Sequence, residues 1–283
     1  MILRLFRRKA RRIVRDTLRL AGVLKDPQES LKGCEVAVVS LAKSGRTWLR
    51  AIIGHALVDA LGLPPENLLD TAALTRAAGL KLTLFTHDGS QRALPRNADR
   101  VSPDKSAYRD IVVHFLHRDL RDVLVSAWFQ ITKRANVYDG TLGQYIRDPV
   151  MGARVLARFS KDWERAAAVP KEFHLIRYEQ LHADPAPAVR RILDSMGASV
   201  SDAQLQRAIA ASTFEKMRQM EESGIFKGPG NILLPGDIND GESYKVRRGI
   251  VGGYKDYMSE ADIAYVDRIV AEEGDPFGTW RDC

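Results

Sequence analysis

Short apolar runs alternate with segments of helical periodicity from residue 36 onwards, and this alternation restricts the chain to an α/β fold. Strands are predicted at 36–41, 81–86, 111–116 and 173–176. The first and third runs are nearly continuous in apolar residues, as expected for parallel strands that are covered on both faces. The pattern therefore predicts a mainly parallel central sheet flanked by helices.

Amphipathic stripes follow most of the strands and predict helices that pack on the sheet. Gly197 ends one stripe, and the sequence SEAD begins the last helix with a capping box. Residues 223–241 are rich in Gly and Pro and predict a long surface loop, a kind of segment that often forms a lid. The stripes cover 48–61, 123–131, 156–166, 189–196 and 263–270.

The net charge of +7 lies at the N-terminus. Residues 1–20 hold eight of the 43 Lys/Arg and one of the 36 Asp/Glu, so the other 263 residues carry 35 of each. A balanced body argues against a nucleic-acid-binding face, which would concentrate positive charge on the folded domain. We therefore expect no nucleic-acid partner.

Residues 1–30 form a basic segment ahead of a single domain at 31–283. At helical spacing, residues 3–24 place apolar side chains on one face and most arginines on the other. Such a helix suits peripheral contact with an anionic membrane through residues 1–24. Packing on the domain is the alternative, and a transit peptide is a third interpretation. With Cys34 and Cys283 as the only cysteines, a reducing, cytoplasmic setting is expected. The basic segment adds the expectation of peripheral attachment to the inner face of the membrane.

The turn after the first strand contains Lys43, Ser44 and Gly45 and leads into a helix. Backbone N–H groups at a helix start, together with a lysine, form an anion site. The stretch does not match the motif G-x-x-x-x-G-K-[ST], which disfavours a kinase or NTPase. A plain tight turn with an exposed lysine is the alternative.

Two later stretches carry further cationic groups. Arg118 follows the third strand, with Ser126 one to two turns into the next helix, and Arg247 and Arg248 precede Gly249. A guanidinium at the carboxyl end of a strand suits a bidentate grip on phosphate. Asp119 and Asp122, between Arg118 and Ser126, are expected to cap or complement the helix start.

Taken together, these stretches resemble the sulfotransferases that use 3′-phosphoadenosine-5′-phosphosulfate (PAPS), with a domain of the cytosolic type. AKSGRTW resembles the family's 5′-phosphosulfate loop PKSGTTW, and RDLRDVLVS resembles its 3′-phosphate motif. RRGIVGGYK resembles the element RKGxxGDWK, so the likeness spans roughly residues 36–255. The resemblance implies a P-loop-like three-layer sandwich, a hydroxyl-bearing acceptor, adenosine 3′,5′-bisphosphate as product, and no metal.

The resemblance also implies roles for individual residues. His87, in FTHDG, corresponds to the histidine of the family's KTH sequence, and the catalytic residues it implies are His87, Lys43 and Ser126. The cofactor-binding residues it implies are Lys43, Ser44, Gly45, Arg46, Thr47 and Trp48 around the 5′ end, Arg118, Ser126, Arg247, Arg248 and Gly249 at the 3′-phosphate, and Trp48, Tyr178, Ser212 and Phe214 around adenine.

The chain departs from the family pattern at several positions within these motifs. Arg46 replaces the first threonine of the loop, and Phe85 replaces the lysine of KTH. Ala42 replaces proline, and Gly253 and Tyr254 replace Asp and Trp. These changes put the acceptor side of the site in question.

The residues also support the chemistry directly. A neutral histidine can take the proton of an attacking alcohol near pH 7, and a lysine can stabilise the leaving oxygen. We expect His87 to be this base, and His114 and His117, in or beside a buried strand, to be structural.

A nucleotide-dependent kinase and a non-catalytic nucleotide-binding protein at a membrane surface are the alternatives. The identity of the acceptor, whether a glycan, a lipid-linked glycan, an alcohol or a phenol, and the oligomeric state are left open.

Overall fold

The structure, a computed structural model, describes residues 31–88, 102–226 and 233–278. Residues 34–283 form one compact unit, distinct from residues 1–33. The predicted basic segment 1–30 lies outside the described residues. All elements named below belong to the larger unit.

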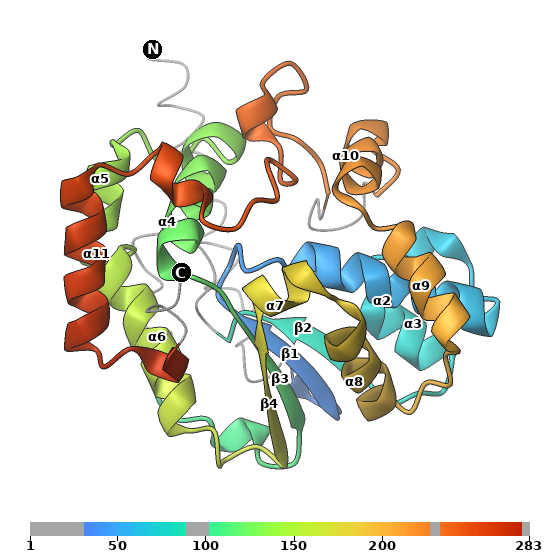
Figure 1. Cartoon of the computed structure of the whole chain (residues 1–283). Coiled ribbons are helices and arrows are strands. Elements are labelled where there is room, and N and C mark those ends of the chain that lie inside the picture. The colour runs from blue at the N-terminus through green and yellow to red at the C-terminus, as the bar shows by residue number, and fades with distance from the viewer. Residues whose placement is uncertain (1–30, 89–101, 227–232, 279–283) are drawn as a thin grey trace, which may run out of the picture. The chain divides into compact units, whose positions relative to one another are not determined.

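Four parallel strands form the sheet, in the order β2–β1–β3–β4 (Figure 1). Each of the four predicted strands is confirmed, with ends that differ by at most two residues. All of β3 is buried, which explains its nearly continuous apolar sequence. The strands are β1 (Val36–Ser40), β2 (Thr83–Thr86), β3 (Val112–His117) and β4 (Glu172–Arg177).

Helices cover both faces of this sheet. Leu116 of β3 belongs to a core with helices α2, α3, α8 and α9, while its neighbour Phe115 packs against Trp163 of α6, with ring centroids 5.5 Å apart. Adjacent strand residues point to opposite faces, so the helices form two outer layers, and the predicted α/β sandwich is confirmed. On the first side lie α2 (Arg46–Leu61), α3 (Thr71–Ala77), α8 (Ala186–Met196) and α9 (Asp202–Ala210); α6 (Ala153–Arg165) covers the other face and packs with α4 (Leu120–Phe129), α5 (Leu142–Ile146) and α11 (Glu260–Glu272).

Two further helices and several single turns complete the described elements. The remaining elements are α7 (Tyr178–Ala183), α10 (Phe214–Ser223), the π-helix η5 (Gln130–Arg134), and the 3₁₀ turns η2 (Pro65–Asn67), η4 (Ser106–Tyr108), η6 (Gly241–Ser243), η7 (Gly253–Asp256) and η8 (Pro276–Gly278).

Helix ends agree with the sequence signals in two places and differ in a third. The capping box of Ser259 and Asp262 begins α11, and Gly197 ends α8 with φ 78°. The helix predicted to run to Ile131 ends instead at Phe129, because the chain widens there into the π-helix η5. Ile131 is still buried, so its apolar character predicted burial correctly but did not predict the type of helical turn.

The predicted loop at 223–241 begins where α10 ends, at Gly224. Within it, the described residues 225–226 and 233–240 form neither helix nor strand. Residues 227–232 lie outside the described part, and a role as a lid stays a prediction.

Candidate active site

The two central strands define where a ligand can bind. β1 connects onward to β2 on one side of the sheet, and β3 connects to β4 on the other, so the chain switches direction between them. Ligands of open α/β sheets bind at the carboxyl ends of the strands at such a switch point. The loops after β1 and β3, which contain Lys43 and Arg118, meet there.

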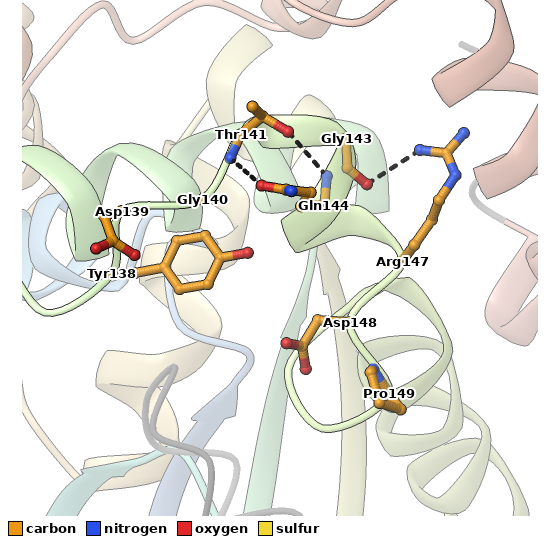
Figure 2. Close-up of a pocket in the computed structure, with 9 residues that line it drawn as sticks. All are labelled: Tyr138, Asp139, Gly140, Thr141, Gly143, Gln144, Arg147, Asp148 and Pro149. Carbon is orange, nitrogen blue, oxygen red and sulfur yellow. Dashed lines mark hydrogen bonds between the residues drawn. The ribbon is translucent and has the colours of Figure 1, made fainter.

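A surface pocket at residues 138–149 belongs to a different region (Figure 2). It contains none of the predicted site residues. Several of its polar groups bond to one another: Thr141 N donates to Gln144 Oε1 at 2.8 Å, and Arg147 Nη1 donates to Gly143 O at 3.0 Å. This pocket therefore does not provide the phosphate-binding groups.

The loop between β1 and α2 is tightly packed. Gly45 has φ 90° and precedes the first residue of α2, Arg46. A Cβ on Gly45 would lie 2.6 Å from Tyr178 Cε2, so only glycine allows the ring to approach the loop. Lys43 also has a positive φ, 73°, and Thr47 lies in the first turn of α2. Predicted residues far apart in sequence thus meet here.

Lys43 is surrounded by other cations. Its Nζ donates to Gln130 Oε1 at 3.3 Å, and the same oxygen accepts from Arg134 Nη1 at 3.1 Å. Burial and the positive charges of Arg134, Arg118 and Arg247 lower the pKa of Lys43 to about 7, although Glu221 acts in the opposite direction. A bound anion would relieve this repulsion and favour the charged form.

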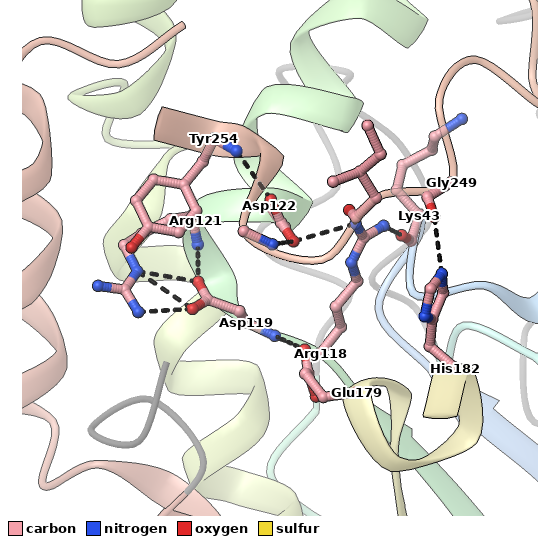
Figure 3. A network of polar contacts seen from close by, with 11 residues as sticks. Lys43, Arg118, Asp119, Arg121, Asp122, Glu179, His182, Gly249 and Tyr254 are labelled. Atoms are coloured by element: carbon pink, nitrogen blue, oxygen red, sulfur yellow. Dashed lines mark hydrogen bonds and ion pairs between the residues drawn. The ribbon is translucent and has the colours of Figure 1, made fainter. Parts of the chain in front are cut away.

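Arg118 joins three segments of the chain (Figure 3). Its Nη1 donates to Lys43 O at 3.1 Å, while Nη2 donates to Ile250 O and pairs with Asp122 Oδ2, both at 3.1 Å. Its guanidinium lies over the Tyr178 ring, 4.2 Å from the centroid. Arg118 belongs to the second motif, RDLRDVLVS. It therefore holds both the first motif, AKSGRTW, and the third motif, RRGIVGGYK.

The two aspartates after Arg118 have different roles. Asp119 caps α4 as predicted, accepting from Arg121 N at 2.7 Å. Asp122 accepts from the backbone N–H groups of Gly252, at 2.9 Å, and Tyr254, at 3.0 Å. It thus fixes the third motif rather than only complementing the helix start.

The paired arginines of the third motif are held within their own segment. Arg247 Nη1 donates to Glu242 Oε2 at 3.0 Å and to Tyr257 Oη at 2.6 Å. Arg248 pairs with Asp256 at 2.7 Å, and this contact raises its pKa. Arg247 also acts on Lys43 electrostatically, whereas the side chain of Arg248 is more exposed to solvent than that of Arg247.

Gly249 links the third motif to the aromatic residues. Its O accepts from His182 Nε2 at 2.8 Å, and its φ of 65° suits glycine. A Cβ at this position would lie 2.9 Å from the ring of Phe214. Phe214, which is 38% exposed, thus lies beside the motif with surface available for a base.

Trp48 is the centre of the aromatic group. Its Nε1 donates to Ser212 O at 2.8 Å, and its ring lies 6.3 Å from that of Tyr178 and 6.2 Å from that of His182. Three of the residues predicted to surround adenine therefore lie together. Ser212 is fully buried, and its Oγ donates to Ala208 O.

His87 follows β2 and is oriented by β1. Its Nδ1 lies 2.9 Å from Ser40 O, and because a carbonyl only accepts, Nδ1 carries the proton and Nε2 the lone pair. Burial and the charges of Arg46, Lys245 and Arg50 place the pKa of His87 well below its ordinary value. The imidazole is therefore neutral and has the tautomer that a base needs at Nε2.

Asp88, the residue beside His87, is held in a buried polar network. Its Oδ1 accepts from Tyr108 Oη at 2.9 Å, and its Oδ2 accepts from Trp163 Nε1 at 3.0 Å and pairs with Lys105 at 2.7 Å. The side chain of Lys105 is fully buried. Asp88 thus anchors the turn that carries His87.

Several residues of the site were missed by sequence reasoning. Gln130 and Arg134 lie four and eight residues after Ser126, which is partly buried on α4, and this spacing was a signal that could have found them. Glu221 is fully buried and accepts from the backbone of Lys245 at 2.7 Å and of Val246 at 2.8 Å. No local pattern indicates that contact.

The histidines of β3 are buried as predicted. Burial and neighbouring positive charge lower the pKa values of His114 and His117 to about 3, so both are neutral. Within the described ranges, no group of three or more His, Cys, Asp or Glu side chains could hold a metal ion.

The donors at the strand ends fit an anionic nucleotide. Ser44 Oγ, Arg46 Nη1 and Arg118 Nε are buried and have no hydrogen-bond partner among the described residues. Buried donors without partners are costly, and phosphate oxygens satisfy several at once. Aromatic rings lie beside them to accept a base, so the donor set suits a phosphorylated nucleoside.

Comparison with known proteins identifies the family. Residues 35–278 match the model of the sulfotransferase domain, so the chain belongs to the sulfotransferase family. Sulfotransferase 2B1 of Mus musculus is 24% identical over 88% of this chain and 74% of its own length. Cytosolic sulfotransferase 9 of Arabidopsis thaliana is 24% identical over 87% of this chain and 79% of its own. The predicted class of activity, sulfonate transfer, is confirmed by this membership.

Solved structures share the fold. Mouse sulfotransferase SULT7A1, complexed with PAP, superposes with a TM-score of 0.57 at 18% identity, over 87% of this chain and 85% of that one. Retinol dehydratase, in complex with androsterone and inactive cofactor PAP, superposes with a TM-score of 0.57 at 18% identity, over 88% of this chain and 83% of that one. The P-loop-like α/β architecture predicted from the resemblance is confirmed.

Proposed function

We propose that this protein transfers the sulfonate group of PAPS to a hydroxyl group of an acceptor and releases adenosine 3′,5′-bisphosphate. The observation that carries the proposal is the convergence of Lys43, Arg118 and His87 at the ends of three neighbouring strands. Lys43 and Arg118 share a hydrogen bond, and His87 bonds to β1 at Ser40.

The nucleotide would be held by the three motifs. Lys43, Ser44, Gly45, Arg46 and Thr47 would contact its 5′ end, which the buried, unpartnered Ser44 Oγ supports. Trp48, Tyr178, Ser212 and Phe214 would surround adenine, as their clustering supports. The 3′-phosphate would lie against Arg118, Ser126, Arg247, Arg248 and Gly249, and the partly exposed Arg248 could exchange Asp256 for a phosphate.

The residues account for each change of bond. PAPS supplies an activated sulfuryl group. His87 Nε2 takes the proton of the acceptor hydroxyl as its oxygen forms the new bond to sulfur. The bond from sulfur to the bridging oxygen of the 5′-phosphate breaks, and that oxygen keeps the electron pair. Lys43 stabilises its charge, with Ser126 between lysine and nucleotide. A sulfuryl group carries less charge than a phosphoryl group, so the cations of the site suffice.

The acceptor and the N-terminal segment belong to the same proposal. Retinol dehydratase holds androsterone in one solved complex and retinol in another, and both are hydroxyl compounds. An acceptor hydroxyl on a small molecule or a lipid-linked glycan fits the proposal equally.

Residues 1–24 would contact an anionic membrane surface peripherally. No helix in the described ranges is long and apolar enough to cross a membrane.

The nucleotide part of the proposal is tested by ligand-induced stabilisation. Adenosine 3′,5′-bisphosphate should raise the melting temperature, while ADP and ATP should raise it far less, because they lack the 3′-phosphate. A ligand at a hundred times its Kd adds about 2.7 kcal/mol to apparent stability. Equal shifts with ATP and the bisphosphate would overturn the assignment. Mass-shift screening of hydroxyl compounds with labelled PAPS then tests transfer itself.

A further inference from the structure

A buried ion pair lies next to the turn that carries His87. Lys105 Nζ lies 2.7 Å from Asp88 Oδ2, and the side chain of Lys105 is fully buried. The same ammonium donates to Ser102 O and lies over the Trp163 ring, 5.2 Å from its centroid. The proposed mechanism uses neither charge, so the pair requires a separate explanation.

Asp88 is fixed through its backbone as well as its side chain. Its φ of 46° is uncommon for a residue other than glycine, although aspartate tolerates this conformation better than most. Its N–H donates to Thr86 Oγ1 at 3.0 Å, and its carboxylate accepts from Tyr108 Oη and Trp163 Nε1. These partners belong to β2, η4 and α6, so three elements determine where the residue after His87 lies.

His87 is held at two points, and Asp88 is one of them. At the ring, Nδ1 lies 2.9 Å from Ser40 O of β1. At the backbone, His87 is bonded covalently to Asp88, which cannot move without breaking its own contacts. A rotation of this turn would lengthen the bond to Ser40, and hydrogen bonds weaken steeply as their geometry departs from the ideal.

Stability alone does not explain an ion pair in this position. Removing two charges from water costs free energy that their attraction barely offsets, and apolar residues of similar volume often stabilise a core equally well. The polar contacts add direction instead, because Lys105 Nζ, Tyr108 Oη and Trp163 Nε1 each need a carboxylate oxygen at one place. Any other position of Asp88 would leave buried donors unpaired, which is costly.

We propose that Asp88 and Lys105 are positioning residues for sulfonate transfer: their ion pair fixes the turn after β2, so that His87 keeps its proton on Nδ1 and presents Nε2 to the acceptor hydroxyl. They act through His87 and contact neither substrate nor nucleotide. The inference rests on the proposed function, in which His87 is the base, and adds the residues that orient it.

The tautomer of His87 tests the proposal without an acceptor. Nitrogen NMR of the histidine side chains at pH 8, where histidine is neutral, should show His87 with its proton on Nδ1 only. Lys105→Met keeps the length of the side chain and removes its charge, so the turn is released and the Nε2–H form should appear. Asp88→Asn removes the other charge, still tolerates the left-handed backbone, and should give the same mixture. His87→Ala identifies the signals.

A single Nδ1–H tautomer in both charge variants would overturn the proposal, as would a parent protein in which the Nε2–H form dominates. If Lys105→Met does not fold, Asp88→Asn and Tyr108→Phe provide the same test. Tyr108→Phe removes one donor and leaves the ion pair, so its effect should be smaller. Tyr145→Phe, the same substitution at a buried tyrosine of α5, is the matched control and should leave the His87 signals unchanged.

Binding and transfer distinguish positioning from a general loss of structure. The charge variants should keep their affinity for adenosine 3′,5′-bisphosphate within a few-fold by calorimetry. Their single-turnover transfer at saturating PAPS, to a hydroxyl compound found by the mass-shift screen, should fall by about 10- to 100-fold, because a displacement of about 1 Å can cost that much. Equal losses of affinity and rate would mean that the pair only supports the fold, and the proposal would fail.

Failure of this inference is distinguishable from failure of the proposed function. If His87→Ala transfers sulfonate at near the parental rate, the assignment of the base is wrong. The NMR result still decides whether Asp88 and Lys105 orient His87, because it requires neither an acceptor nor turnover.

Discussion

In the proposed site, Lys43 is the residue at which we expect charge state and ligand binding to be coupled. Its Nζ shares Gln130 Oε1 with Arg134, and its pKa of about 7 lies far below the usual value for lysine. Burial is the main cause, followed by neighbouring positive charge. A bound polyanion offsets the effect of the neighbouring positive charges on the pKa of Lys43, because it stabilises the protonated amine.

Binding of adenosine 3′,5′-bisphosphate should therefore take up protons above pH 7. Free Lys43 is then mostly neutral, while the bound anion raises its pKa, so affinity should fall as pH rises. Calorimetry at pH 8 in HEPES and Tris, which differ in ionisation enthalpy, measures the uptake. Lys43→Met should reduce it without abolishing it, because burial also lowers the pKa of Lys245. Unchanged uptake in Lys43→Met would show that other groups titrate.

His87 should affect turnover and not nucleotide binding. In His87→Ala the base is lost, so single-turnover sulfonate transfer at saturating PAPS should fall by about 10² to 10⁴. Affinity for the bisphosphate should stay within a few-fold, because Nε2 faces the acceptor in the proposed mechanism. Transfer at near the parental rate would exclude His87 as the base. Asp88 would then be a poor substitute, since Tyr108, Trp163 and Lys105 already occupy its oxygens.

At the scale of elements, the site depends on how α4 and the segment 245–254 are joined. Asp122 of α4 holds Arg118 and the backbone of Gly252 and Tyr254, and Glu221 of α10 holds the start of the same segment. The π-helix η5 extends α4 and carries Gln130 to Lys43. Short π-helical segments occur often at functional sites, because the wider turn redirects side chains.

Asp122→Asn should loosen this junction. The amide loses the ion pair with Arg118, and leaving partners of a buried charge unsatisfied costs about 1 to 3 kcal/mol. We expect that loss of unfolding free energy in urea and at least tenfold weaker bisphosphate binding. Asp267→Asn removes a carboxylate that is 53% exposed and 3.4 Å from Arg121, and should cost about 0 to 1 kcal/mol with no change in binding. Equal bisphosphate affinity in the two variants would contradict the role of Asp122.

At the scale of the whole molecule, charge is separated along the chain. All of the net charge lies in residues 1–20, while the remaining residues are balanced. Within the balanced part, cations still gather around Lys43 and His87. Local clustering and net charge are therefore independent, and they correspond to the two anionic ligands of the proposed function, a nucleotide at the sheet and a membrane surface at the N-terminus.

Deletion of residues 1–24 should separate these two properties. The full chain is expected to bind vesicles of phosphatidylglycerol and phosphatidylcholine at low salt and to release them at high salt, because the attraction is screened. The truncated protein should lose this binding and keep its bisphosphate affinity. Co-sedimentation at two salt concentrations measures vesicle binding, and calorimetry measures bisphosphate affinity. A full-length protein that ignores these vesicles at low salt would end the membrane hypothesis.

The sequence by itself determined the strands, their parallel arrangement and the three motifs. These follow from local rules: buried parallel strands need continuous apolar runs, and motif residues next to a strand end reach the same edge of the sheet. Lys43 and Arg118 could therefore be placed together from the sequence alone, and the resemblance to the family added Gly249. The end of α4 could not be predicted, since the buried Ile131 fits both an α-helical and a π-helical turn.

The tertiary structure decided which polar groups pair across the chain. Gln130 meets Lys43 from 87 residues away, Asp122 meets Gly252 from 130, and Glu221 meets Lys245 from 24. The state of His87 depends in the same way on Ser40, Arg46 and Lys245. Such contacts need side chains from separate elements to meet within about 3 Å. Whether they meet depends on how the helices pack on the sheet, and this packing cannot be predicted from the local periodicity of the sequence.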